Sequence, residues 1–178
     1  MSGQPIAHAE LMRLIEAARW APSSYNAQPW RFLYAHRGTA AWPRFLGLLI
    51  EFNQAWASRA AALLLVGSRS RFEHNEQPSR THSFDAGAAW ANLALQGSAQ
   101  GLVVHGRQGF DYERARVELG VPDEFTVEAM IAVRPPRARG GPARGPARPR
   151  AAVAPPGRGR DRLRRPPPQG SSSQRGRS

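Results

Sequence analysis

The sequence predicts a mixed α+β sandwich, in which a central sheet is flanked by helices. Helical and strand-like segments alternate along residues 6–133 without the regular spacing of βαβ units. The continuous apolar run at 61–68 is typical of a buried strand, and the helical segment at 83–101 is apolar nearly all round. Because both segments need cover on more than one side, we expect helices to enclose the sheet and the helix 83–101 to be buried.

The positive charge of the chain divides it into two parts. The net charge is +12, but residues 1–133 hold 12 arginines against 12 acidic residues, whereas residues 134–178 hold 13 arginines and only Asp161. A body of 133 residues buries about two-thirds of the surface that its unfolded chain exposes, which is enough for one domain. We therefore expect one domain at 1–133 and an Arg/Pro/Gly-rich tail at 134–178.

The tail lacks the residues that build a core. It contains 10 prolines, 7 glycines and no aromatic residue, so we expect it to be disordered. Such a tail can bind nucleic acid nonspecifically through its charge. Arg, Pro, Ala and Gly are also encoded by GC-rich codons, so an out-of-frame reading would give the same composition, and both origins stay open.

Several classes of protein are excluded by residues and motifs that the sequence lacks. Without cysteine there is no disulfide, thiolate nucleophile or Cys-ligated metal, and without lysine there is no P-loop or Schiff-base lysine. The motifs G-x-G-x-x-G, G-x-S-x-G and H-E-x-x-H are also missing. Apolar runs far shorter than about 20 residues and the absence of a signal-peptide pattern predict a cytoplasmic protein with no membrane partner.

The apolar periodicity predicts four helices and four strands. We expect helices at 6–20, 43–57, 83–101 and 112–119, the third with Ser83 as its N-cap. The helix at 43–57 places four large side chains on one face: Phe45, Leu48, Leu49 and Phe52. We expect strands at 30–35, 61–68, 103–105 and 127–133, and a polar surface loop at 69–80.

A polar elbow joins the first helix to the first strand. Pro22 ends the helix, and Pro29 forces an extended exit into Trp30. Between them lie four short donors and acceptors that suit a planar ligand, although such clusters are also typical of simple turns: Ser23, Ser24, Asn26 and Gln28.

A second candidate segment follows the third strand, at residues 106–110. Gly106 and Gly109 allow a ligand to approach the backbone, with Arg107 and Gln108 beside them. The same pattern is also compatible with a plain strand-to-helix turn.

These two segments carry a resemblance to a known family. The string R-W-A-P-S-S-Y-N-A-Q-P-W-R-F at 19–32 resembles the signature of the FMN-dependent nitroreductase family. H-S-F-D-A-G-A-A at 82–89 and G-R-Q-G-F-D at 106–111 are similar to the family's central helix and flavin-side loop. The resemblance covers most of residues 6–133 and implies the nitroreductase type of sandwich, FMN as cofactor, and a homodimer through the helix 83–101.

The resemblance also implies the site. The elbow of one subunit contributes to the flavin site of the other, which makes Pro22, Ser23, Ser24 and Asn26 candidate FMN contacts and Gln28 a weaker one. Gly106, Arg107, Gln108 and Gly109 correspond to the flavin-side loop. Because the flavin supplies the redox chemistry, we expect no catalytic side chain and no metal ligand.

Four other side chains near these segments have more than one interpretation. His82 and His105 are compatible with proton donors or metal ligands, although structural histidines are commoner. Arg19 and Arg31 flank the elbow, where pairing with acids or lying along the helix is more typical than cofactor contact.

Two functions follow from the resemblance and the tail. The first is transfer of electrons from NAD(P)H through FMN to nitroaromatic, quinone or activated-alkene acceptors. The alternative is a noncatalytic flavin-fold scaffold whose basic tail binds nucleic acid. The resemblance also implies that the family's Arg-Ser phosphate motif would precede Met1, and that the sequence from Arg134 departs from the family's C-terminal segment. On this basis we expect weakened FMN binding and impaired activity.

Overall fold

The computed structural model describes residues 5–136 and contains one antiparallel sheet of four strands in the order β1-β2-β4-β3. The strands are β1 (Trp30–His36), β2 (Ala62–Arg69), β3 (Val103–Arg107) and β4 (Phe125–Arg134). The helices are α1 (His8–Arg19), α2 (Trp42–Gly47), α3 (Glu51–Ala57), α4 (His82–Ala99) and α5 (Tyr112–Leu119), with a 3-10 turn η1 (Ser24–Asn26). None of the helices described is long and apolar enough to cross a membrane.

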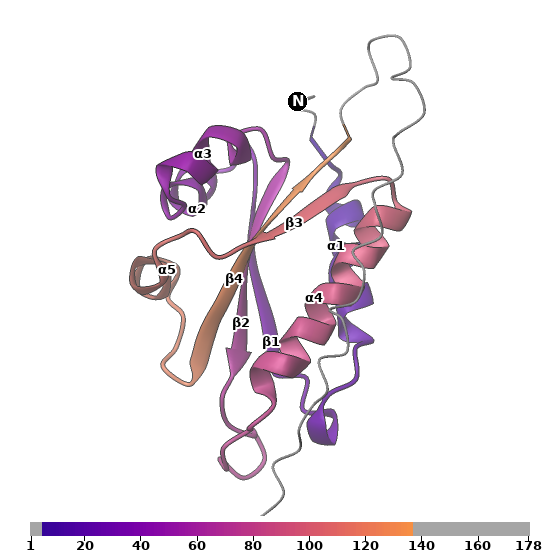
Figure 1. Cartoon of the computed structure of the whole chain (residues 1–178), viewed down its shortest axis with the longest axis vertical. Helices are drawn as coiled ribbons and strands as arrows, with labels where there is room; N and C mark the ends of the chain where they lie inside the picture. Colours follow the sequence, from indigo (N-terminus) through magenta and orange to yellow (C-terminus); the bar gives the residue numbers. More distant parts are fainter. Residues whose placement is uncertain (1–4, 137–178) are drawn as a thin grey trace, which may run out of the picture. The chain divides into compact units, whose positions relative to one another are not determined.

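Helices cover both faces of the sheet (Figure 1). The long helices α1 and α4 pack on one face, and the short helices α2, α3 and α5 lie on the other. This arrangement confirms the predicted mixed α+β sandwich.

Strand β2 runs through the centre of both cores. Its side chains alternate, so that Leu64 and Val66 belong to the core under α1 and α4, while Leu63 and Leu65 belong to the other core. All four side chains are at most 2% exposed. The prediction of a buried strand is therefore confirmed, because the run is continuously apolar where β2 is buried on both faces.

Helix α4 is buried on one side only within a single chain, so cover on its other side stays a prediction that needs a partner subunit. Ala86, Ala89 and Leu93 face the core, whereas Leu95 is 69% exposed on the outer side. The close approach of α4 to β3 depends on Gly97, because a Cβ there would lie 2.2 Å from Cγ2 of Val104. The small residues thus let the inner face of α4 approach the sheet.

The predicted helix at 43–57 was wrong, because the chain forms two short helices there. Ile50 is extended (φ −62°, ψ 153°), and Leu49 pairs with Phe110 in an isolated bridge. The break rotates α3 relative to the expected register, so Phe52 is 78% exposed and contributes nothing to the core.

Three predicted boundaries also differ. Thr81, not Ser83, precedes the first turn of α4; Ser83 lies within the helix, and its hydroxyl donates to Glu128. Gly106 and Arg107 pair with β4 and so belong to β3, not to a loop. Arg134 pairs with Val103 at the end of β4, and residues 137–178, which hold most of the predicted tail, lie outside the described residues.

Candidate functional site

The elbow between α1 and β1 contains three non-glycine residues in the left-handed region. Tyr25, Asn26 and Gln28 have φ angles of 52°, 54° and 46°. The turn is closed by two backbone hydrogen bonds of 3.0 Å, from Asn26 to Ser23 and from Ala27 to Ser24. Left-handed backbone is uncommon for a residue as bulky as tyrosine, and such strain gathers at ligand sites.

The elbow is held to helix α4 through a buried carboxylate. The backbone N–H of Ser24 donates to Oδ2 of Asp85 at 3.0 Å, and the Thr81 hydroxyl donates to the same oxygen at 3.2 Å. Asp85 is only 5% exposed. It is a residue of the site that the sequence analysis missed, since an acidic residue in the first turn of a helix is common without any such contact.

Internal hydrogen bonds complete the shape of the elbow. The Gln28 N–H donates to Oγ of Ser23, and Nε2 of Gln28 donates to Oδ1 of Asn26, each at 3.0 Å. Within the described part of the chain, Oγ of Ser24 and Nδ2 of Asn26 make no hydrogen bond, and Pro22 is exposed. The elbow therefore keeps two polar groups available to a ligand.

The segment after β3 is held by helix α3 on the other face of the sheet. The Gly109 carbonyl accepts from Nδ2 of Asn53 at 2.8 Å and from the Ile50 N–H at 3.1 Å. A Cβ on Gly109 would lie 2.4 Å from Nδ2 of Asn53, so packing requires glycine at this position. The N–H groups of Gln108 and Gly109 donate to no group among residues 5–136.

Arg107 is half-buried and packs against helix α3. Its guanidinium carbon lies 3.2 Å from the Trp56 ring centroid, and Nη1 donates to Oδ1 of Asn53. Burial lowers the pKa of Arg107, and its Nε atom is buried without a hydrogen-bond partner in the described structure. Asn53, 5% exposed, thus joins Arg107 to Gly109, and no sequence motif marked it.

Gly106 serves the packing of β3 against helix α4. A Cβ on Gly106 would lie 3.1 Å from Cζ2 of Trp90. Of the four residues predicted in this segment, Gly106 and Arg107 contact their own chain, while the N–H groups of Gln108 and Gly109 donate to no group among residues 5–136.

The two segments lie at opposite edges of the sheet. The elbow leads into β1, and the Gln108–Gly109 segment follows β3, and these are the two edge strands. One is held by α4 and the other by α3, which cover opposite faces. A single chain therefore does not combine them into one site.

His82 belongs to a polar cluster with Ser68 and Glu128. Oγ of Ser68 lies 2.7 Å from Nδ1 of His82 and donates to Oε1 of Glu128, which also accepts from Ser83 at 2.6 Å. Because the only proton of the Ser68 hydroxyl goes to Glu128, this network assigns a proton to Nδ1 of His82. Glu128 is the extra residue of a bulge, since Gly67 pairs with Val127 and Val66 with Ala129.

The remaining polar residues have contacts within the chain. The His105 ring packs edge-on against Trp56, and burial, Arg107 and Arg134 lower the pKa of His105. Arg19 pairs with Glu16 at 2.6 Å, and Arg31 donates to the carbonyls of Gln28 and Trp30. No group of three or more potential metal ligands occurs within residues 5–136.

The antiparallel sheet covered by helices on both faces defines a fold shared with many solved structures. A crystal structure of an oxidoreductase containing FMN is 46% identical, with a TM-score of 0.72 over 75% of this chain and 69% of that one. A putative nitroreductase from Desulfovibrio desulfuricans, solved in complex with FMN, has the same fold at 23% identity, with a TM-score of 0.63 over 81% of this chain and 83% of that one.

The sequence comparisons give the family directly. The model of the nitroreductase family matches residues 2–133, and the chain belongs to this family. An NADH dehydrogenase from Thermus thermophilus is 27% identical over 171 residues, covering 78% of this chain and 81% of that protein. An uncharacterised 15.4 kDa protein from Mycolicibacterium smegmatis is 34% identical over 110 residues, covering 58% and 73%.

Proposed function

We propose that this chain is an FMN-dependent oxidoreductase that takes electrons from NAD(P)H and passes them to nitroaromatic, quinone or activated-alkene acceptors. Family membership and the 46% identical FMN-containing oxidoreductase support the cofactor. The Thermus NADH dehydrogenase supports the nicotinamide donor. The structural observation that carries the proposal is the pair of segments, at opposite sheet edges, that each leave hydrogen-bonding groups without a partner in the described chain.

The residues present fit a flat ring with polar edges. FMN, when bound, supplies the hydride and electron transfer, so the protein has to bind and orient it. The N–H groups of Gln108 and Gly109 are donors for one edge of the ring, because neither has a partner among residues 5–136. Ser24 and Asn26 add a hydroxyl and an amide from the elbow.

The other predicted residues support these contacts. Arg107 orients the Gly109 segment through Asn53, and Ser23 and Gln28 hold the elbow in its left-handed conformation. Pro22 ends helix α1 and aims the elbow away from it. Preorganised groups of this kind bind a rigid ligand without ordering cost.

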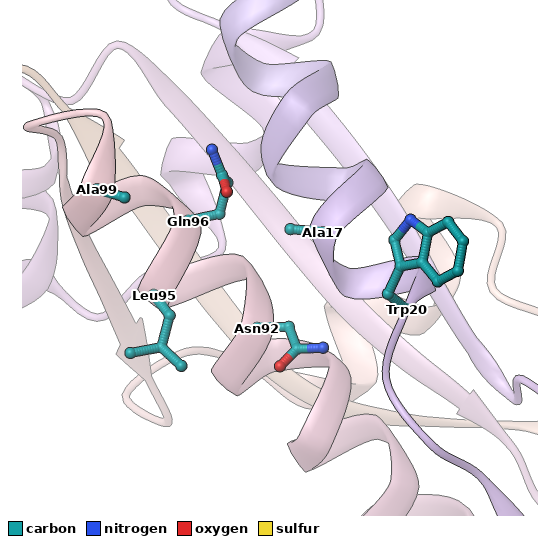
Figure 2. A pocket seen from close by; sticks show the side chains of 6 residues that line it. All are labelled: Ala17, Trp20, Asn92, Leu95, Gln96 and Ala99. Atoms are coloured by element: carbon teal, nitrogen blue, oxygen red, sulfur yellow. The ribbon is translucent and has the colours of Figure 1, made fainter.

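A homodimer is part of this proposal, because only a second copy can bring an elbow to the Gln108–Gly109 segment. Helices α1 and α4 leave an open groove between them, with Trp20 72% exposed and Leu95 69% exposed (Figure 2). Exposed apolar side chains around a groove are typical of a subunit interface. We propose that the groove packs against the partner's α4.

Turnover with a supplied cofactor tests the function. The protein is incubated with FMN, and oxidation of NADH and of NADPH is followed with menadione or nitrofurazone as acceptor. We expect oxidation that requires FMN and an acceptor. A chain that binds no FMN and catalyses neither reaction, but retains DNA, would contradict the proposal and favour the scaffold function.

The oligomeric state tests the shared site. Leu95→Glu places a charge in the groove on α4, and we expect it to give monomers or aggregates and to abolish FMN binding, because the charge would be buried in the interface. Ala40→Glu, on an exposed turn between β1 and α2, is the matched control and should leave a dimer. Light scattering that gives a monomer for the unmodified chain would contradict both the interface and the shared site.

A further inference from the structure

A second cavity lies on the face of the sheet opposite α4, away from the groove of Figure 2. It has a volume of about 330 Å³. Its floor is formed by Leu33 of β1 with Leu65 and Gly67 of β2. Its wall is formed by Val121 and Pro122, from the connection between α5 and β4, and by Phe125, the first residue of β4. The flavin-binding function proposed above uses none of these residues.

The wall of the cavity is held in place by the protein itself. Arg116 donates from Nη1 to the Pro122 carbonyl at 2.9 Å and from Nη2 to the Phe125 carbonyl at 2.7 Å. Gly120 ends α5 in the left-handed conformation (φ 65°), which turns the chain toward the cavity. The cavity is therefore preformed, as small-molecule sites usually are.

The floor is open because β2 has a glycine there. A Cβ on Gly67 would lie 3.5 Å from the Thr126 carbonyl oxygen and 3.9 Å from Cδ1 of Phe125, both ordinary contacts. Packing thus tolerates a side chain at this position. Because Gly67 has no side chain, an apolar volume beside Leu65 stays unfilled.

One positive charge stands at this apolar cavity. Arg31, the one charged residue among those lining it, has its guanidinium carbon 5.8 Å from the Phe125 ring centroid. Its Nη1 donates to the carbonyls of Gln28, at 3.1 Å, and Trp30, at 2.8 Å. Nε and Nη2 donate to no group within residues 5–136. These two N–H groups form one side of the guanidinium, which matches the two oxygens of a carboxylate.

We propose that this cavity binds a small aromatic carboxylate, with the ring against Leu33, Leu65 and Phe125 and the carboxylate on Nε and Nη2 of Arg31. The apolar lining suits a ring, and the single cation requires an anion to accompany it. A volume near the lower end of the range for ligand sites, about 300 to 1,000 Å³, limits the ligand to one or two rings.

Binding of benzoate to the full chain, saturated with FMN, tests the proposal. Saturation with FMN occupies the proposed flavin site, so failure of that site to bind FMN is seen separately. By NMR titration we expect saturable binding at millimolar concentrations, with shifts at the methyl groups of Leu33 and Val121. Benzamide, which has the same ring without the charge, should bind at least about tenfold more weakly.

Two variants locate the ligand. Arg31→Gln should weaken benzoate at least about tenfold, while Arg59→Gln, at an exposed site on another segment, should leave it unchanged. Gly67→Val fills the floor and should also block binding with Arg31 intact, which keeps the test valid if Arg31→Gln disturbs the elbow. The proposal is overturned if benzoate does not bind to the FMN-saturated chain, if benzamide binds equally well, or if either folded variant retains full affinity.

Discussion

The elbow and the Gln108–Gly109 segment are held in their conformations by different kinds of contact. Both adjoin an edge strand, and both leave hydrogen-bonding groups without a partner in the described chain. The elbow places tyrosine, asparagine and glutamine in left-handed backbone and is tied to α4 by Asp85. The segment after β3 instead uses glycine, with Asn53 of α3 packed where a Cβ would stand.

The elbow has a strained backbone, whereas the segment after β3 is limited by the space around Gly109. The elbow keeps an unfavourable conformation because hydrogen bonds hold it, so removing an acceptor should relax it. The segment after β3 is unstrained but crowded, so adding an atom should displace it. Substitutions in the two segments should therefore change stability and FMN affinity in different ways.

Gly109→Ala should have the largest effect, because the added Cβ would overlap Nδ2 of Asn53. We expect a loss of about 1–3 kcal/mol in the free energy of unfolding and at least a tenfold loss of FMN affinity. Denaturant unfolding and FMN titration measure both. Gly47→Ala, where nothing lies within 4 Å of the new Cβ, is the control and should be neutral. Unchanged FMN affinity in Gly109→Ala would remove this segment from the site.

Asp85→Ala should destabilise the protein by about 1–3 kcal/mol, because the Ser24 N–H loses its acceptor. Asp85→Asn retains an oxygen that can accept the same hydrogen bond, so it should lose less stability and keep more FMN affinity. Thermal unfolding and FMN titration of both variants measure this ranking. Equal effects of the two substitutions would show that the elbow does not depend on the acceptor.

Ser24→Ala combined with Asn26→Asp should affect binding without affecting folding. The two changes remove Oγ and Nδ2, which have no partner in the described chain, and keep the acceptor for Gln28. We expect about a tenfold loss of FMN affinity and a change in stability within about 0.5 kcal/mol. A large loss of stability with unchanged affinity would mean that these groups support the fold and do not bind FMN.

The pH dependence of stability should show the smallest effect, at His36, the last residue of β1. Burial, and His8 with Nδ1 3.4 Å from Nε2 of His36, lower the pKa of His36, so the unfolded chain binds its proton more readily. The contribution of His36 to the free energy of unfolding is fully present above its unfolded pKa of about 6.5. It is lost as the pH falls through the lower pKa of the folded state. His36→Gln should reduce the drop in melting temperature between about pH 7 and pH 5. An unchanged drop would assign it to other groups, such as His105, whose pKa is also lowered.

Much of the fold could be predicted because it follows from local patterns. The apolar run in β2, the end of α1 before Pro22 and the strand after Pro29 depend on side-chain type and on the backbone limits of proline. The split of the 43–57 helix could not be predicted, because it depends on the pairing of Leu49 with Phe110, 61 positions further along the chain. The same distance hid Asp85 and Asn53, whose contacts with Ser24 and Gly109 span 61 and 56 positions.

Short stretches of residues are enough to predict the class of fold, the family resemblance, and the two segments that the proposed site uses. The residues that hold those segments, the packing of Arg107 on Trp56, and the position of the segments at opposite sheet edges are seen only in the folded chain. These features depend on packing and hydrogen bonds between residues far apart in the chain. A single Cβ or acceptor at such a contact has no signature in the local sequence.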